Sequence, residues 1–236
     1  MAPATPVPNV DTTLFTPTRM RSTERAALLQ RLLAVDPFDP APGNRGITSE
    51  GVDLARLRMQ TLHLGPLVVA VLGPGRDERL PLLFDAISTA GRTLEPRVQP
   101  VLVVCGSPRS GSDDADRLLS LVMTTGLRES VLLAGQVPHG ELPSLFAAAD
   151  AYVSAARHTT ASLWEAMACA TPPILLSDAD VEQVIVQGGY DANGWVSDPC
   201  SEGLAAALVQ VCLDPAERLR RGTAAAARAR AQGTSS

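Results

Sequence analysis

The sequence contains no lysine, because all 20 of its basic residues are arginines. Any anion site must therefore use guanidinium groups or backbone N–H groups, since no side chain supplies an ammonium group. Aromatic residues make up only 3% of the chain, although hydrophobic residues make up 45% of it. Alanine, leucine and valine must therefore provide most of the packing in the core.

Other absences narrow the class of protein. The net charge of −5 argues against a general affinity for nucleic acid or for an anionic membrane surface. No apolar run approaches the ~20 residues of a membrane-spanning helix, so no transmembrane segment is expected. The first stretch, MAPATPVPNVDTT, lacks a basic start and an apolar run, so it is not expected to be a signal peptide.

The four cysteines show neither the C-x-x-C pairs nor the neighbouring histidines of a metal site. They are Cys105, Cys169, Cys200 and Cys212. Cys105 and Cys169 lie in apolar runs and are expected to be buried free thiols. Free thiols suit a reducing compartment, so we expect a cytoplasmic protein. The spacing of the cysteines and histidines leads us to expect no bound metal ion.

From residue 66 onward, short apolar runs alternate with segments of helical periodicity. The apolar runs predict strands at 66–73, 98–106, 130–135, 151–155, 173–178 and, at an edge of the sheet, 194–199. Helices are predicted at 79–91, 113–126, 140–149, 181–189, 201–214 and 215–232, with a further one around Glu165. This alternation with short connections predicts an α/β fold with a doubly wound parallel sheet.

The chain is predicted to consist of three parts. Residues 1–65 form a helical and loop segment that leads into the domain, with helices at 23–35 and 49–62. Residues 66–222 form the doubly wound domain. Residues 223–236, rich in alanine and arginine, form a frayed C-terminal tail.

Four loops of similar composition follow the predicted strands, at 73–79, 106–112, 135–140 and 156–162. Ligands of open α/β sheets bind at this carboxyl edge, and the glycines, serines and arginines of these loops suit a phosphate-bearing ligand. Glycines after strands usually only turn the chain, and the arginines at 76 and 79 are equally consistent with a solvated loop. The G-x-G-x-x-G and G-x-x-x-x-G-K-[ST] motifs are absent, which disfavours those two nucleotide-binding folds.

Glu165 lies in an apolar helix that begins with hydroxyl residues and ends at two prolines. Ser162 and Glu165 have the S-x-x-E spacing of a capping box, which contributes roughly 1 kcal/mol to a helix and has no further function. Spacing alone favours this interpretation, and a ligand contact remains the alternative. His158 is interpreted as a loop histidine rather than a general base, since no Ser/His/Asp set is present.

Four segments match motifs of a known family. They are VPNVDTTLFTP at 7–17, VLLAGQVPHGELPSLFAAADAYVSA at 131–155, TTASLWEAMACATPPILLSD at 159–178 and NGWVSDP at 193–199. The last three resemble the C-terminal half of retaining glycosyltransferases of family 4, and the first resembles their interdomain stretch. The similarity runs from about residue 7 to about residue 232, and the E-A-M-A-C-x-x-P block is its most specific part.

The resemblance implies a GT-B architecture, in which two Rossmann-like domains face a cleft and the C-terminal one binds a nucleotide-sugar donor. This chain corresponds to that C-terminal half. By position, Glu165 matches the glutamate that binds the ribose hydroxyls, a role that suits a carboxylate because it accepts two hydrogen bonds. Thr159 and Thr160 match the loop that contacts the diphosphate. Val137 lies in the loop that lines the base pocket.

The resemblance also implies the catalytic residues. Arg76 and Arg79 resemble the basic pair that clamps the diphosphate and stabilises it as a leaving group, a task for which the family needs neither a metal ion nor a cofactor. Arg157 and His158 occupy the positions of a glutamate and a glycine beside the donor sugar. A guanidinium only donates hydrogen bonds, so Arg157 cannot replace a carboxylate that accepts them from sugar hydroxyls.

The sequence departs from the family in further places. Ala170 replaces a glycine, and Arg76 and Arg79 are closer together than the usual clamp pair. The Gly-Gly expected after the Ser-Asp at 177–178 is absent. The acceptor domain, roughly another 170 residues, is expected to be supplied from outside this chain.

Two functions of different classes are therefore open. The first is a glycosyltransferase donor-binding domain that transfers a sugar from a nucleotide diphosphate sugar with retention, together with an acceptor domain or partner chain. The second is a catalytically degenerate nucleotide-binding or scaffold subunit of an active glycosyltransferase. Glu165 and the loop arginines favour the first function, and Arg157 favours the second. Activity of the chain alone is not expected.

Overall fold

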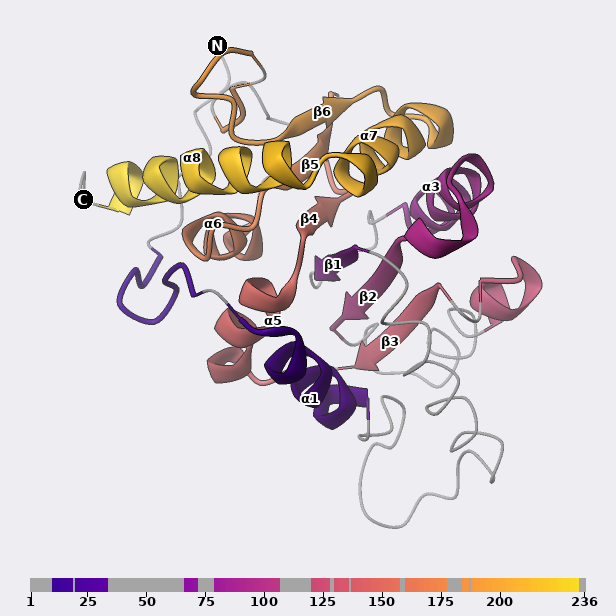
Figure 1. Ribbon diagram of the computed structural model, residues 1–236, viewed down its shortest axis with the longest axis horizontal. Helices are drawn as coiled ribbons and strands as arrows, with labels where there is room; N and C mark the ends of the chain where they lie inside the picture. Colours follow the sequence, from indigo (N-terminus) through magenta and orange to yellow (C-terminus); the bar gives the residue numbers. More distant parts are fainter. Residues whose placement is uncertain are drawn as a thin grey trace.

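The computed structural model describes residues 10–18, 20–33, 66–71, 79–106, 120–127, 130–135, 137–157, 160–177, 184–186 and 188–233. Within these residues, six parallel strands form one sheet in the order β3-β2-β1-β4-β5-β6 (Figure 1). They are β1 (Leu67–Val71), β2 (Val101–Cys105), β3 (Val131–Gly135), β4 (Ala151–Ser154), β5 (Pro173–Leu176) and β6 (Trp195–Ser197). This is the strand order of the Rossmann fold, which confirms the predicted doubly wound parallel sheet.

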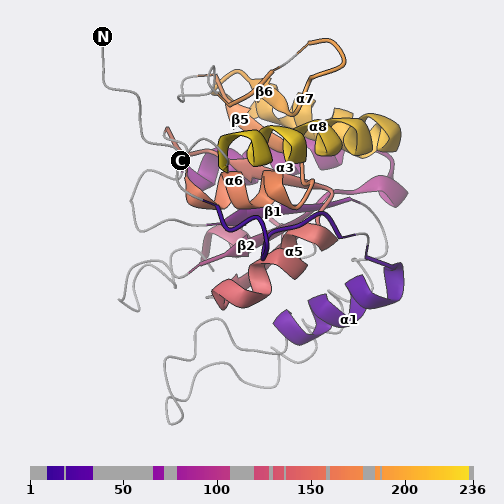
Figure 2. The same ribbon diagram turned by 90° about the vertical axis from the view of Figure 1, so that its left-hand side faces the viewer.

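Helices cover both faces of the sheet (Figures 1 and 2). One face carries α3 (Leu80–Thr93) and α7 (Ser201–Leu213), and the other carries α1 (Ser22–Leu33), α5 (Leu142–Ala148), α6 (Ala161–Ala168) and α8 (Pro215–Gly233). The 3-10 turns η1 (Pro96–Val98) and η2 (His139–Glu141) follow α3 and β3. Residues 120–124 are also helical. None of the helices in the described ranges is long and apolar enough to cross a membrane.

Successive side chains of each strand enter different cores, because side chains alternate along a strand. In β1, Leu67 and Val69 pack beneath α6 and α8, whereas Val68 and Ala70 pack beneath α3 and α7. All four side chains are buried. A strand that is buried on both faces needs a continuous apolar sequence, which is why the apolar runs predicted the strands correctly.

The described part of the first 65 residues packs onto the sheet. The predicted helix at 23–35 is confirmed as α1. Phe15 and Leu28 are buried in the core that also contains α5 and α6. Asp150, just before β4, pairs with Arg25 of α1 at 2.9 Å and accepts a hydrogen bond from the backbone N–H of Leu67 at 2.8 Å. This N-terminal segment therefore shares the core of the sheet domain.

One prediction of secondary structure is wrong, and another is confirmed and extended. The predicted helix at 181–189 is not formed at Val184–Val186. The predicted helix at 215–232 is confirmed as α8, which continues to Gly233, so the described part of the predicted tail belongs to this helix. Ala225 and Ala229 are at most 2% exposed, so this end of α8 packs on the core. The predicted helix at 49–62 lies outside the described residues, and the division of the chain into three parts otherwise stays a prediction.

α8 packs directly on the turn that follows α6. Ala170, in this turn, has a left-handed backbone with φ of 64°. The carbonyl oxygen of Ala170 approaches Gly222 of α8 so closely that a β-carbon at position 222 would collide with it. Gly222 is therefore required by close packing between two segments of backbone.

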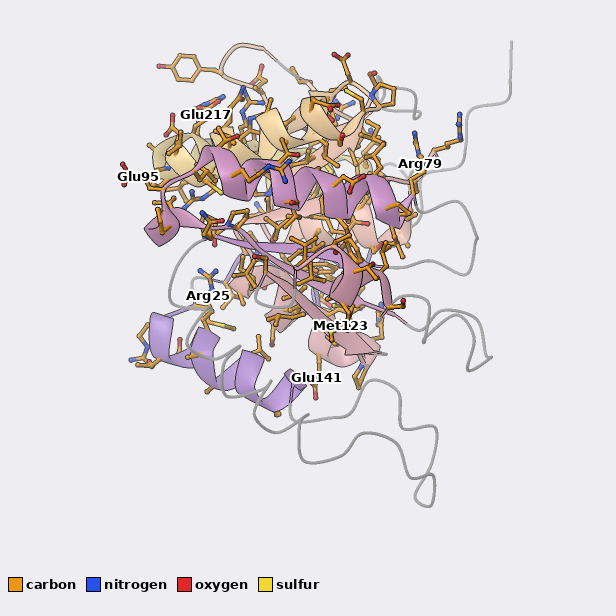
Figure 3. All side chains as sticks on the ribbon, turned by 90° about the vertical axis from the view of Figure 1, so that its right-hand side faces the viewer. Arg25, Arg79, Glu95, Met123, Glu141 and Glu217 are labelled. Atoms are coloured by element: carbon orange, nitrogen blue, oxygen red, sulfur yellow. The ribbon has the colours of Figure 1, made fainter. Side chains whose placement is uncertain are left out.

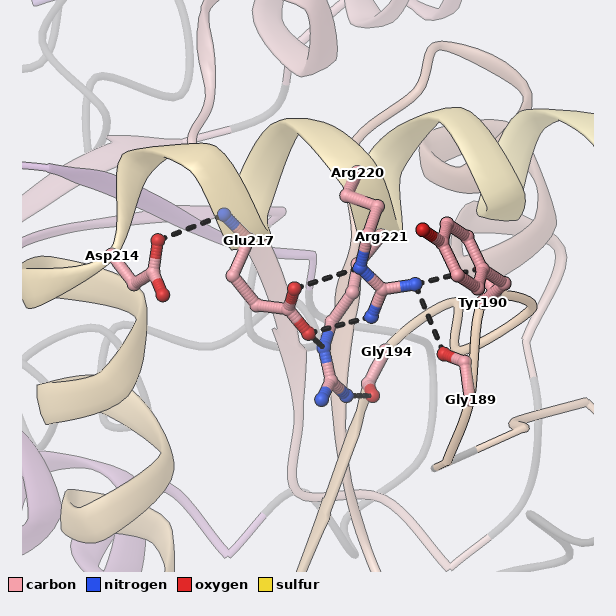
Figure 4. A network of polar contacts seen from close by, with 7 residues as sticks. All are labelled: Gly189, Tyr190, Gly194, Asp214, Glu217, Arg220 and Arg221. Carbon is pink, nitrogen blue, oxygen red and sulfur yellow. Dashed lines mark hydrogen bonds and ion pairs between the residues drawn. The ribbon is translucent and has the colours of Figure 1, made fainter.

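An arginine network attaches the start of α8 to the loop before β6 (Figure 4). Glu217 binds Arg220 at 2.6 Å and Arg221 at 2.7 Å. Arg220 donates to the carbonyl oxygen of Tyr190 at 2.7 Å, and Arg221 donates to that of Gly194. These contacts fix the loop through its backbone, so the role of this network is structural.

Candidate functional site

The carboxyl ends of β1 and β4 lie at the point where the strand order reverses. Ligands of doubly wound sheets bind at such a switch point. Arg79, the residue before α3, spans it, because its Nε donates to the carbonyl oxygen of Ala155, just after β4, at 2.9 Å. Figure 3 shows Arg79 at the opposite end of the molecule from Arg25 and Glu217. The structure thus places Arg79 at the predicted edge, whereas Arg76 lies outside the described residues.

Arg79 also has an unusual backbone. Its φ of 37° and ψ of 43° place it in the left-handed region, which residues other than glycine seldom adopt. Strained residues of this kind persist where the surrounding structure holds them in place, and they cluster at functional sites. The bond to Ala155 is one such restraint.

Three hydroxyl groups meet where α6 begins. The Oγ atoms of Thr160 and Ser162 lie 2.9 Å apart, and the hydroxyl of the buried Tyr152 lies 3.1 Å from that of Ser162 and 3.4 Å from that of Thr160. Thr160 is the N-cap residue, but its side chain makes no capping hydrogen bond. A helix start without a side-chain cap presents N–H groups to an anion, and here hydroxyl donors lie beside it.

Glu165 does not cap α6. The helix begins at Ala161, so Glu165 lies beyond the first turn. Its Oε1 instead lies 3.0 Å from Nε2 of His139 on η2. The Glu165 side chain is 13% exposed. The capping-box interpretation is therefore wrong, and the ligand role of Glu165 stays a prediction. A carboxylate with one such partner retains acceptor sites for hydroxyl groups.

His139 is the candidate that sequence analysis missed. It belongs to the loop after β3 that contains Val137, a half-buried residue packed against the core. The rings of His139 and Phe15 make an edge-to-face contact, with centroids 5.3 Å apart and an interplanar angle of 68°. The position of His139 in a loop at the carboxyl edge was the available signal, but nothing local indicated its contact with Glu165.

The N-terminal segment brings an acidic group close to His139. The Thr13 hydroxyl and backbone N–H groups bond to the Asp11 carboxylate and lower its pKa, with a smaller contribution from the charge of His139. The segment that resembles the family's interdomain stretch therefore lies beside the loop that contacts Glu165.

The remaining predicted donor-site residues lie just before α6. Arg157 is exposed in the bend after β4. His158 and Thr159 lie outside the described residues. The structure thus gathers Arg79, Arg157 and Thr160 at the carboxyl ends of β1 and β4, with Glu165 one turn further along α6.

Burial makes two of the cysteines poor nucleophiles. Burial raises the pKa of Cys105 and of Cys169 to about 12, and the charge of Glu165 adds to the effect at Cys169. Both are buried free thiols, as predicted. The described part of the chain includes no group of three or more His, Cys, Asp or Glu side chains placed to hold a metal ion.

A sequence model of the family described as "Glycosyl transferases group 1" matches residues 75–229, well over half of the chain. The chain belongs to this family. The match includes Arg79, Thr160 and Glu165, so the residues at the switch point lie within the family's own region.

Curated proteins similar to this member of the group 1 family are D-inositol 3-phosphate glycosyltransferases. The one from Salinispora arenicola is 32% identical over 191 residues, which cover 76% of this chain and 40% of the relative. The one from Kineococcus radiotolerans is 31% identical over 141 residues, which cover 56% of this chain and 32% of the relative. The chain thus spans less than half the length of these relatives.

Solved glycosyltransferases share the fold of this group 1 family member. A sucrose-phosphate synthase from Thermosynechococcus elongatus superposes with a TM-score of 0.66 at 20% identity, over 96% of this chain and 47% of that one. Anabaena HepE in complex with UDP-glucose superposes with a TM-score of 0.62 at 18% identity, over 96% of this chain and 51% of HepE. The C-terminal domain of the group 1 protein LpcC from Francisella tularensis superposes with a TM-score of 0.62 at 20% identity, over 94% of this chain and 97% of that domain. The predicted GT-B C-terminal domain fold is thereby confirmed.

Proposed function

We propose that this chain is the donor-binding domain of a retaining glycosyltransferase that uses a nucleotide diphosphate sugar. The observation that carries the proposal is the carboxylate of Glu165, held by His139 near the uncapped start of α6. Family membership and the UDP-glucose complex of HepE, a protein of the same fold, support a nucleotide-sugar donor.

In the proposed site, three sets of protein groups bind three different parts of the donor nucleotide. The carboxylate of Glu165 accepts hydrogen bonds from the two ribose hydroxyls, because a carboxylate is a pure acceptor with several lone pairs. Thr160 and the N–H groups at the start of α6 bind the diphosphate, since a helix N-terminus favours negative charge. Val137, on the loop after β3, lines the base pocket.

Transfer then requires the diphosphate to leave the sugar. Negative charge develops on the diphosphate as the bond from the anomeric carbon to its oxygen breaks, and a guanidinium placed there stabilises that charge. We assign this role to Arg79, which lies at the carboxyl edge of the sheet, and to Arg76 as the second member of the pair. The acceptor binds on another domain, for which the relatives have room outside the 40% or less of their length that matches this chain.

Calorimetric titration tests this proposal. The chain is titrated with uridine, adenosine and guanosine diphosphates and with their glucose esters, and the Glu165→Ala variant is titrated in parallel. We expect one base to bind, and the variant to bind it about tenfold or more weakly, since a hydrogen bond to a charged group contributes ~1.5–3 kcal/mol. Absence of binding, or equal binding by the variant, would contradict the ribose role.

Arg157 favours a second candidate function, a nucleotide-binding subunit that has lost turnover. It occupies the position of a sugar-contacting carboxylate and lies exposed at the carboxyl edge. In that case Arg157→Glu would strengthen binding of a neutral-sugar donor relative to the free nucleotide. Product formation after mixing the unmodified chain with an acceptor-domain protein would instead favour the transferase.

A further inference from the structure

The carboxylate of Glu165, on α6, is hydrogen-bonded to a histidine from a separate turn of the chain. Its Oε1 lies 3.0 Å from Nε2 of His139, although the two residues are 26 positions apart in the sequence. Glu165 lies on α6, which follows β4, whereas His139 lies on η2, which follows β3. The pair therefore joins α6 to the turn that follows β3, where the proposed function puts the ribose.

The two side chains differ in exposure. The Glu165 side chain is 13% exposed, whereas that of His139 is 63% exposed. A carboxylate at this depth cannot turn freely toward water, so the direction of its lone pairs depends on its partner. An Nε2–H of His139 bonded to Oε1 fixes the plane of the carboxylate and leaves Oε2 and a second lone pair of Oε1 as acceptors.

The His139 ring is itself supported. Phe15 is 1% exposed within the hydrophobic core, and its ring contacts that of His139 at 68°. Phe15 thus forms a rigid wall on one side of the imidazole, which restricts the ring orientations that are open to it. Glu141, on the same turn, pairs with Arg31 of α1 and takes no part in the contact with Glu165.

We propose that His139 is a positioning residue that orients the Glu165 carboxylate toward the ribose, so that the site selects a ribonucleotide over a 2′-deoxyribonucleotide. This inference rests on the proposed function, because it assigns the ribose to Glu165. His139 acts through Glu165 and not through the nucleotide, so its loss affects the preference for ribose more than the affinity for the rest of the ligand.

The experiment measures dissociation constants for uridine diphosphate and 2′-deoxyuridine diphosphate, or for the matching pair of whichever base binds. The variants are Glu165→Ala, His139→Ala and His139→Gln, with Glu141→Ala as the control on the same turn. Glutamine is included because its side-chain amide reaches the position of Nε2 and donates one hydrogen bond there.

We expect the unmodified chain to prefer the ribonucleotide about tenfold or more, and Glu165→Ala to remove this preference. His139→Ala should reduce the preference by about threefold or more, with the affinity for the deoxynucleotide unchanged within about twofold. His139→Gln should retain most of the preference, and Glu141→Ala should retain all of it.

Three outcomes would overturn the inference. His139→Ala could weaken both ligands equally, which would mean that His139 contacts the base or supports the fold. It could leave both affinities unchanged, which would mean that the bond to Glu165 has no effect on binding. If the unmodified chain binds no nucleotide, or Glu165→Ala keeps the ribose preference, the proposed function fails as well. The Glu165→Ala result thus separates the two failures.

Discussion

The Nε atom of Arg79 donates a hydrogen bond of 2.9 Å to the carbonyl oxygen of Ala155, which joins the start of α3 to the end of β4. This bond crosses the switch point of the sheet, where the proposed donor site lies. It uses one of the several N–H donors of the guanidinium and fixes the direction of the whole group.

Replacement of Arg79 is therefore expected to weaken binding of the diphosphate. Arg79→Ala should raise the dissociation constant for uridine diphosphate about tenfold or more, and that for the monophosphate less, because the guanidinium is proposed to contact the diphosphate. Calorimetry with both nucleotides measures the difference. Arg92→Ala is the control, since Arg92 lies near the other end of α3 and binds Ser88 and Thr89 of the same helix. Equal losses for both nucleotides would contradict this role.

The close approach of α8 to the turn after α6 predicts a strong effect at Gly222. In most helix interiors, glycine to alanine stabilises a protein by ~1 kcal/mol. At Gly222 the new β-carbon would collide with the carbonyl oxygen of Ala170, so we expect Gly222→Ala to lower the free energy of unfolding by about 1–3 kcal/mol. Denaturant unfolding measures this. Gly188→Ala is the control, because no atom lies within 4 Å of a β-carbon there.

The left-handed backbone of Ala170 predicts a stabilising substitution. Its φ is 64°, a conformation that glycine adopts without steric cost. We expect Ala170→Gly to raise the free energy of unfolding by about 0.5–1 kcal/mol, although glycine also increases the entropy of the unfolded chain. Ala206→Gly, at an exposed position of α7, should lower it by ~1 kcal/mol. A decrease in both variants would show that the turn relaxes around Ala170.

Acid should weaken the network at the start of α8. Hydrogen bonds from Arg220 and Arg221 lower the pKa of Glu217 from its usual 4.5 to about 2. Because this pKa is lower in the folded state, the stabilisation is complete above about pH 4.5 and is lost as the pH falls toward about 2. Between about pH 5 and about pH 3, urea unfolding should show a smaller loss of stability for Glu217→Gln than for the unmodified chain. Identical pH slopes would contradict this, and Glu95→Gln, on the turn after α3, serves as the control.

The sheet was predictable because its strands are buried on both faces. Their sequences are therefore continuous apolar runs, bounded by turn residues. The helix that forms α8 was predicted as well, but the burial of its second half was not. Its buried positions, Gly222, Ala225, Ala226 and Ala229, follow the spacing of one helix face, although a segment rich in alanine and arginine suggested a frayed end.

The candidate site was predictable only in part. The spacing of Ser162 and Glu165 fits a capping box, but helix starts are uncertain by one or two residues, and α6 begins two residues earlier than that motif requires. The contacts of Glu165 with His139, and of His139 with Phe15, join segments that are far apart in the sequence. No local pattern encodes such contacts, because they depend on how the loops of the carboxyl edge come together.

The central claim is that Glu165 binds the ribose of a nucleotide diphosphate. A crystal structure of the chain with the nucleoside diphosphate selected by calorimetry tests it most directly, through the distances from the Glu165 carboxylate to the two ribose hydroxyls. We expect both hydroxyls within hydrogen-bond distance of the carboxylate, about 2.5–3.0 Å, with the diphosphate at the start of α6. A nucleotide bound elsewhere, or with its ribose turned away from Glu165, would contradict the claim.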